Sequence, residues 1–125
     1  QVCLHHIRQI KWALGIDGVQ TSVCSWATLP TMGADGKKHE GAQIDLVIDR
    51  RDQTINLCEM KFCMRPFEIT PAYLEHIISR RELFREVTGT NKALHLTFVT
   101  TYGLVKNAQY GMIQSEVTMD DLFKY

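Results

Sequence analysis

The chain has 125 residues, of which 45% are hydrophobic and 22% are charged, as expected for one globular domain (1-125) with a substantial core. Its 14 basic and 14 acidic residues cancel, which excludes a global basic field, so any binding of nucleic acid would need a local patch. No apolar run approaches the ~18 residues of a membrane span and no signal peptide is visible, so we expect a cytoplasmic protein without a membrane partner.

The first predicted elements are a helix and a strand. Apolar residues recur at helical spacing over Gln1–Leu14, and Gly15 is the predicted stop. Because the chain starts inside this helix, we expect it to be a fragment of a longer protein. β-Branched residues in rough alternation predict a strand over Val19–Trp26, and the aperiodic segment Ala27–Glu40 predicts a loop. At its end, Lys37-Lys38 is either solvated loop charge or a phosphate contact.

The next two strands form a predicted hairpin. Two runs rich in β-branched and apolar residues, Gln43–Ile48 and Thr54–Phe62, flank the charged turn Asp49–Gln53. Neither run alternates cleanly between apolar and polar residues. This pattern predicts strands that are covered on both faces, with helices as the cover.

Three charged residues lie in this hairpin. Glu59 and Lys61 are two apart, so both side chains point to one face of a strand, and the five-residue turn sets Asp45 roughly opposite Glu59. Charges buried in such strands need partners or a metal. Two carboxylates would bind a hard divalent cation, and the lysine could orient a water or counter phosphate charge. The alternative is a hairpin with a salt bridge between Glu59 and Lys61 or across the strands.

A helix, a strand and a short tail follow the hairpin. Thr70-Pro71 predicts a helix N-terminus, and the helix should run to about Val87 and stop at Gly89. The alternating segment Lys92–Thr101 predicts a fourth strand, and the tail adds a short edge strand and a last helical turn at Thr118–Phe123. The expected fold is an α/β domain (αβββαβ) with a four-stranded mixed sheet flanked by helices.

Arg81 interrupts the apolar stripe of the second long helix. Arg80 and Arg85 flank it, so this helix has the densest positive charge of the chain. Arg81 either lays its stem on the sheet with its head in water, or reaches the carboxylates or a substrate phosphate. The predicted buried stripe consists of Leu74, Ile77, Ile78 and Phe84.

The cysteines contain no CxxC pair and lie in apolar contexts, which predicts free buried thiols in a reducing compartment, with neither disulfide nor zinc. Cys58 should point away from the acidic residues and pack under a helix. The alternative is a zinc site made of Cys58, Cys63 and either His5 or His6. The four cysteines are Cys3, Cys24, Cys58 and Cys63.

The pattern Asp45…Glu59-Met60-Lys61 resembles the PD-(D/E)XK nuclease superfamily, whose core is helix–strand–strand–strand–helix–strand. The superfamily signature is an acidic residue on the second strand followed by (D/E)-X-K on the third, and here Ile44 replaces the proline. More narrowly, five segments resemble the nuclease-like C-terminal domain of a family of prokaryotic P-loop (AAA-type) ATPases. These segments are HHIRQIKWALGI, GAQIDLVIDR, INLCEMKF, HLTFVTTYG and VTMDDLF.

The resemblance implies a restriction-endonuclease-like core and metal-dependent hydrolysis of DNA. Asp45, Glu59 and the main-chain carbonyl of Met60 would hold Mg²⁺ or Mn²⁺, and Lys61 would complete the catalytic set. The superfamily also uses an acidic residue on the first helix, which the resemblance sets upstream of Gln1. The resemblance also implies an ATP-binding ATPase domain that precedes this one in the same polypeptide. No G-x-x-x-x-G-K-[ST] motif occurs here, so we expect that domain to be missing from this fragment. The alternative is a catalytically silent module for DNA contact or protein assembly.

Overall fold

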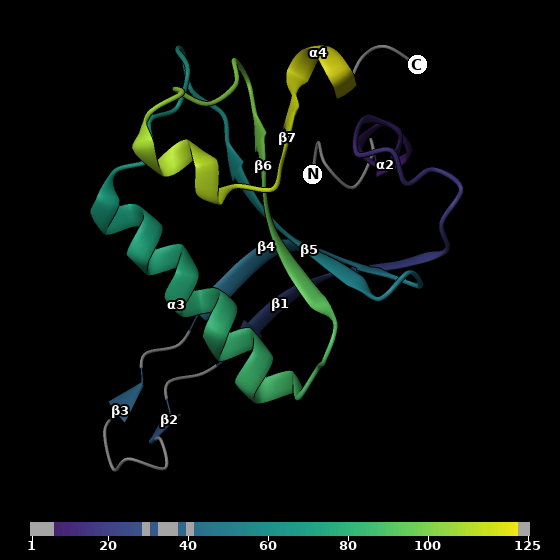
Figure 1. Ribbon diagram of the computed structural model, residues 1–125, viewed down its shortest axis with the longest axis vertical. Coiled ribbons are helices and arrows are strands. Elements are labelled where there is room, and N and C mark those ends of the chain that lie inside the picture. The colour runs from purple at the N-terminus through teal and green to yellow at the C-terminus, as the bar shows by residue number, and fades with distance from the viewer. Residues whose placement is uncertain (1–6, 29–30, 33–37, 40–41, 123–125) are drawn as a thin grey trace.

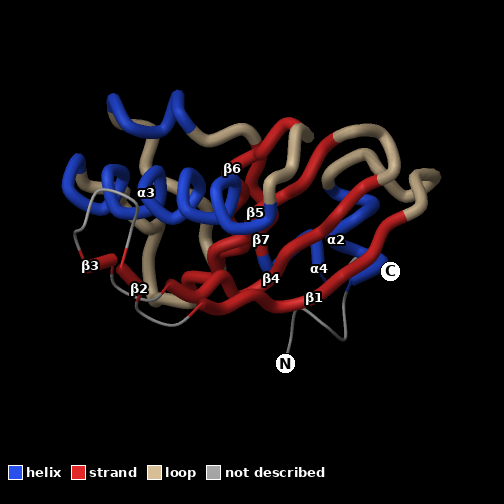
Figure 2. Tube along the Cα trace, turned by 90° about the horizontal axis from the view of Figure 1, so that it is seen from below, coloured by secondary structure: helices blue, strands red, loops and turns tan. Residues whose placement is uncertain are grey.

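The computed structural model describes residues 7–28, 31–32, 38–39 and 42–122. Figure 1 shows the long helix α3 lying across one face of a twisted sheet, while α2 and α4 lie together near the chain termini. Figure 2 shows α3 stacked on the sheet as a separate layer. In chain order the elements are α2 (Ile7–Ala13), β1 (Thr21–Thr28), β2 (Thr31–Met32), β3 (Lys38–His39), β4 (Ala42–Arg50), β5 (Thr54–Lys61), α3 (Pro71–Thr88), β6 (Ala93–Thr100), the 3-10 turn η1 (Ala108–Met112), β7 (Ser115–Thr118) and α4 (Met119–Leu122).

The main sheet is mixed and has the strand order β1-β4-β5-β6-β7. β4 pairs antiparallel with β1 and β5, whereas β5–β6 and β6–β7 are parallel. The predicted α/β class is confirmed, but the expectation of a four-stranded sheet is wrong because the sheet has five strands. The tail strand β7 joins it, since Val117 pairs with Val99 and both side chains are fully buried.

The predicted central hairpin is present as β4 and β5. Its turn includes Gln53, which has a φ of 69°. The five consecutive residues Ile55 to Glu59 are buried, so β5 is covered on both faces, as the lack of clean alternation in this run predicted.

Each face of the sheet has its own apolar core. On one face Ile10 of α2 packs with Cys58 and Val117, so the prediction that Cys58 packs under a helix is confirmed. On the other face two clusters lie beneath α3, around Phe84 and Ile77. The sheet is therefore the middle layer of three.

Helix α3 begins and ends where local sequence signals predict. The Thr70 hydroxyl accepts a hydrogen bond from the Tyr73 amide at 3.1 Å, and Pro71 occupies the first helical position. At the other end Gly89 adopts a φ of 68° and donates its N–H to the Arg85 carbonyl at 2.9 Å. These caps fix the position of the arginines of α3 above the sheet.

Two expectations need correction, and several residues fall outside the described part. The segment predicted as a loop contains the small antiparallel ribbon β2–β3. Cys24 was expected to be buried but is exposed, because it lies on the edge strand β1.

None of the helices within the described ranges is long and apolar enough to cross a membrane. Four residues named in the sequence predictions lie outside the described part. They are Cys3, expected as a free thiol, His5 and His6 of the alternative zinc site, and Lys37 of the basic pair.

Candidate functional site

The residues singled out in the hairpin lie at the end of β4 and β5 that is far from their turn. The register between the two strands ends with the pair Leu46–Cys58. Continued by one residue, this register sets Asp45 opposite Glu59, and residues directly opposite in an antiparallel pair are close neighbours.

A bulge in β4 changes the exposure of this region. The pairing with β1 steps from Cys24–Val47 to Trp26–Ile44, so β4 carries one extra residue here. Ile44 is 2% exposed and packs with the cluster beneath α3. Asp45 is exposed, so the expectation that it is buried is wrong; the extra residue interrupts the alternation of β4 at this point.

Glu59 is the buried acidic group of the site. It is 8% exposed, and its Oε1 lies 2.6 Å from Nη2 of Arg80. The Tyr73 hydroxyl donates to the same oxygen at 3.4 Å. Both contacts involve Oε1, and Oε2 takes part in no hydrogen bond or ion pair among the described residues. Glu59 therefore keeps one carboxylate oxygen for a further ligand.

Arg80 connects α3 with both strands of the site. Its Nη1 donates to the Gln43 carbonyl on β4 at 2.9 Å, and its Nη2 contacts Glu59 on β5. Its Nε is buried without a hydrogen-bond partner, next to a cavity of about 10 Å³, roughly the size of one water. Sequence reasoning emphasised Arg81 instead. Helical spacing places Arg80, three residues after the buried Ile77, on the same side of the helix, but Arg81, four residues after Ile77, shares this signal.

The pKa of Glu59 depends on the charges of the two other predicted residues, Asp45 and Lys61. Burial is the main cause that raises the pKa of Glu59. The positive charge of Arg80 lowers this pKa, the negative charge of Asp45 raises it, and the ammonium of Lys61 lowers it. Asp45 and Lys61 thus both lie within electrostatic range of Glu59.

Lys61 is half-buried and lies beside two aromatic rings. Its Nζ is 5.1 Å from the ring centroid of Tyr73 and 5.6 Å from that of Phe67. A cation at this distance is attracted by the ring faces, which fixes the ammonium at the end of β5. Burial raises the pKa of Tyr73, the Glu59 carboxylate raises it further, and Lys61 lowers it.

Arg81 and Met60 are the other two predicted site residues. Arg81 contacts Glu82 at 3.5 Å and also lines the small cavity beside Glu59. The half-buried side chain of Met60 packs on the opposite face of the sheet, in the cluster beneath α2. In a strand this arrangement leaves only the main-chain carbonyl of Met60 for the site.

The oxygen atoms that could hold a metal come from few residues. No group of three or more His, Cys, Asp or Glu side chains in the described ranges is arranged to hold a metal ion. Asp45, the free Oε2 of Glu59 and the Met60 carbonyl are hard oxygen donors, the type that Mg²⁺ and Mn²⁺ prefer. Mg²⁺ commonly binds proteins through one or two carboxylates and keeps several waters, so this donor set fits such an ion.

No family model matches the chain, and no curated protein matches it. Among solved structures, it is similar to the crystal structure of a protein of unknown function, AF1548. The TM-score is 0.52, the sequence identity is 16%, and the match covers 97% of this chain and 64% of that chain. This chain therefore spans less than two thirds of the length of AF1548. At this identity the likeness supports the α/β fold and says nothing of activity.

Proposed function

We propose that this domain is a metal-dependent DNA phosphodiesterase of the nuclease-like type that its sequence resembles. The order of helix, three main-sheet strands, helix and strand agrees with that resemblance. The observation that carries the proposal is the buried carboxylate of Glu59, which the register of β4 and β5 sets opposite Asp45 and which lies two residues before Lys61 on β5. An acidic pair that can hold a divalent cation and a nearby amine are groups that support metal-dependent hydrolysis of a phosphodiester.

Each residue has a defined role in this proposal. Asp45, Oε2 of Glu59 and the Met60 carbonyl would hold Mg²⁺ or Mn²⁺. The bound cation would supply an activated water and stabilise charge on the phosphate. Lys61, held beside the rings of Tyr73 and Phe67, would orient the attacking water and offset the developing negative charge. Arg81, which lines the cavity beside Glu59, would contact a substrate phosphate once it leaves Glu82.

Arg80 adds a feature that the resemblance does not include. Burial raises the pKa of the Glu59 carboxyl, and the Arg80 guanidinium opposes this effect by compensating the negative charge. The guanidinium also ties Glu59 to the Gln43 carbonyl on β4, which holds the two strands at a fixed separation. Arg80 is therefore a positioning residue for the site.

The second candidate is a catalytically silent nuclease-like module that contacts DNA or serves assembly with an upstream P-loop ATPase domain. The ion pair between Glu59 and Arg80 favours it, because this pair satisfies the buried charge without a metal. In both readings the domain works beside an ATP-binding domain of the same polypeptide, in the cytoplasm.

DNA cleavage in the presence of Mg²⁺ or Mn²⁺ tests the first candidate. The 125-residue chain is incubated with supercoiled and linear duplex DNA, and so is a longer polypeptide that includes any sequence upstream of Gln1. Lys61→Ala should reduce the cleavage rate by about 100-fold while DNA affinity is unchanged, because Lys61 acts on the transition state. Asp45→Ala should lose Mn²⁺ binding as well, as measured by calorimetry.

Lys106→Ala is the matched control, since Lys106 is exposed and lies in the segment that follows β6. It should cleave like the wild type. If neither polypeptide cleaves DNA, or if cleavage survives both Lys61→Ala and Asp45→Ala, the catalytic proposal is wrong and the silent module is the correct description.

A further inference from the structure

A second pocket lies at the turn end of the β4–β5 hairpin, away from Glu59. Its volume is about 380 Å³, and four of the residues that line it are cationic. We propose that this pocket binds the phosphate groups of a nucleic-acid backbone. The inference rests on the proposed function, for which it supplies the local basic patch that a chain of zero net charge needs. The four cations are Lys11, Arg50, Arg51 and Lys92.

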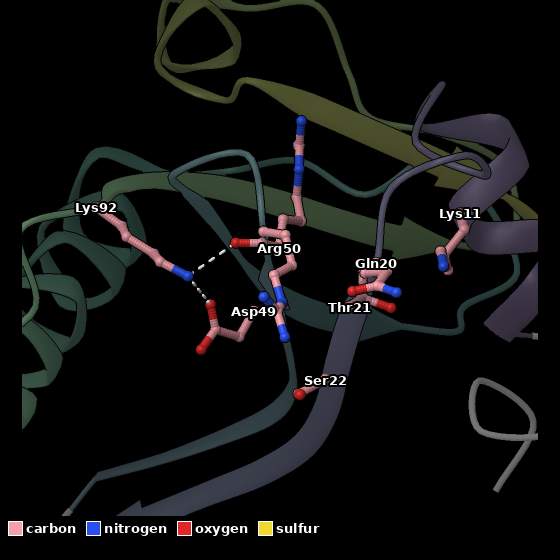
Figure 3. Close-up of a pocket in the computed structure, with 8 residues that line it drawn as sticks. Lys11, Gln20, Thr21, Ser22, Asp49, Arg50 and Lys92 are labelled. Atoms are coloured by element: carbon pink, nitrogen blue, oxygen red, sulfur yellow. Dashed lines mark hydrogen bonds and ion pairs between the residues drawn. The ribbon is translucent and has the colours of Figure 1, made fainter.

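The pocket is assembled from segments that are far apart in the sequence. Lys11 comes from α2, Arg50 from the end of β4, and Lys92 from the residue before β6. Figure 3 shows Lys92 and Lys11 entering from opposite sides, with Asp49, Arg50 and the start of β1 between them. Because only the tertiary fold brings these cations together, no sequence motif marks the site.

Both lysines are held in place and still have donors for a ligand. Nζ of Lys92 donates to Oδ1 of Asp49 at 2.6 Å and to the Arg50 carbonyl at 2.8 Å. Nζ of Lys11 donates to the Val19 carbonyl at 3.0 Å. An ammonium has three N–H donors, so Lys92 keeps one and Lys11 keeps two. Their side chains are therefore partly ordered before an anion arrives, which lowers the entropy cost of binding.

The two arginines differ in how far they are engaged. Arg50 donates to Asp52 at 2.9 Å and to Asn56 at 3.1 Å, and its hydrogen bond lowers the pKa of Asp52. The Arg51 side chain makes no hydrogen bond or ion pair with the described residues. Its backbone N–H donates a hydrogen bond to the Gln20 carbonyl. The negative charges of Asp49 and Asp52 offset two of the four cations, so this region has a net charge of two positive.

Uncharged donors complete the pocket. Gln20, Thr21 and Ser22 line it with one amide and two hydroxyl groups, and side chains of these types contact phosphate oxygens in protein–DNA complexes. A mixture of cations and neutral donors without an apolar wall suits a phosphate better than an uncharged ligand.

The arginines of α3 are by contrast already engaged. Arg80 contacts Glu59 at 2.6 Å, and Arg81 contacts Glu82 at 3.5 Å. Arg85 donates to the carbonyls of Thr90 and Lys92 at 3.1 and 3.2 Å. All three arginines of α3 therefore already have a partner, whereas the side chain of Arg51 in the hairpin pocket makes no hydrogen bond or ion pair with the described residues.

The pocket and the candidate site lie at different places along β4. Arg50 is five residues from Asp45 along this strand, which corresponds to roughly 17 Å at the rise of a strand. Arg50 contacts Asn56, which shares with Cys58 the face covered by α2, whereas Glu59 contacts Arg80 of α3. The pocket would therefore hold the DNA backbone away from the position that is cut.

DNA affinity measured without divalent metal tests this inference. Fluorescence anisotropy of a labelled duplex is recorded in EDTA for the 125-residue chain, Arg51→Glu, Lys11→Glu and Lys106→Glu. Arg51→Glu is the principal variant, because the Arg51 side chain makes no hydrogen bond or ion pair with the described residues that the substitution would remove. We expect Arg51→Glu and Lys11→Glu to lower affinity about tenfold and to reduce the slope of log K against log salt by about 0.9 each. Lys106→Glu, the same charge change beyond the other end of β6, should change affinity less than about twofold.

The outcomes separate this inference from the proposed function. If Arg51→Glu remains folded by circular dichroism and binds DNA no worse than Lys106→Glu, the inference is wrong. If pyrophosphate binds the pocket and Arg51→Glu abolishes that binding while DNA affinity is unchanged, the site takes a small phosphate and the nucleic-acid assignment is overturned. If the wild type never cleaves DNA but Arg51→Glu weakens binding, the pocket stands and the catalytic proposal fails.

Discussion

At the scale of single residues, Glu59 shows how a buried charge is tolerated. Burial disfavours its ionised form, and Arg80 opposes this effect through a contact of 2.6 Å. Both the Tyr73 hydroxyl and Arg80 contact Oε1, so the other oxygen stays available. The negative charge of Glu59 is thus compensated by Arg80, and its Oε2 can still bind a further ligand.

We predict that Glu59 titrates above the ordinary range of a glutamate. Its pKa should rise further in Arg80→Ala and in Lys61→Ala, which remove cations, and should fall in Asp45→Asn, which removes a neighbouring negative charge. Carboxyl ¹³C chemical shifts measured between about pH 3 and pH 9 follow this titration. Lys106→Ala should leave the titration unchanged, and an unshifted Glu59 in Asp45→Asn would contradict the proximity of the two carboxyl groups.

The raised pKa also has a consequence for stability. The folded state holds this proton more tightly than the unfolded state does. The contribution of Glu59 is therefore fully present below the unfolded pKa, and it is lost as the pH rises through the raised folded pKa. In Glu59→Gln this part of the pH dependence of the free energy of unfolding should disappear, as checked by urea unfolding at several pH values.

At the scale of elements, α3 is defined by its ends and by the sheet beneath it. Its caps were readable from the sequence because Thr70, Pro71 and Gly89 act through their own backbone geometry. The apolar stripe was readable as well, and Ile77 and Phe84 are buried as predicted. Which arginine contacts Glu59 was not readable, because Arg80 and Arg81 both lie on the sheet side of the helix and only the position of β5 selects Arg80.

Gly89→Ala should lower the free energy of unfolding by about 1 kcal/mol, because an alanine resists the left-handed conformation that ends α3. A methyl group at this position would meet no atom within 4 Å, so the cost comes from the backbone alone. Gly18→Ala is the matched control: it also has open space, and Gly18 is not among the glycines of positive φ. Thermal and urea unfolding should show a loss for the first variant and none for the second, and equal losses would contradict the argument.

At the scale of the whole molecule, the sheet separates two cores that stabilise each other through β5. Residues of β5 alternate between the cluster beneath α2, which contains Cys58, and the clusters beneath α3, which contain Leu57. The short helix α2 contributes Ile10, whose side chain is fully buried. A helix of this length is not stable alone, so its order depends on this packing.

Ile10→Ala should therefore destabilise the protein by roughly 2–5 kcal/mol, through lost apolar burial and the cavity that remains. Val87→Ala, on the exposed side of α3, should change the free energy of unfolding by less than about 0.5 kcal/mol. Urea unfolding measures both. Because Lys11 of the hairpin pocket also lies on α2, loosening this helix should weaken DNA binding in the anisotropy assay. A loss of stability from Ile10→Ala no larger than that from Val87→Ala would show that α2 is not part of the cooperative core.

The sequence by itself determined the α/β class, the central hairpin, the caps of α3 and the identity of the charged residues in the hairpin. These features depend on side-chain periodicity and on backbone preferences of a few adjacent residues, so they are local. Only the tertiary structure decided that the tail strand pairs parallel with β6, that a bulge exposes Asp45, and that Arg80 contacts Glu59. It also decided that Lys11 and Lys92 meet across one pocket. These features depend on contacts between segments far apart in the chain, and their energies are set by packing and register, which no local pattern encodes.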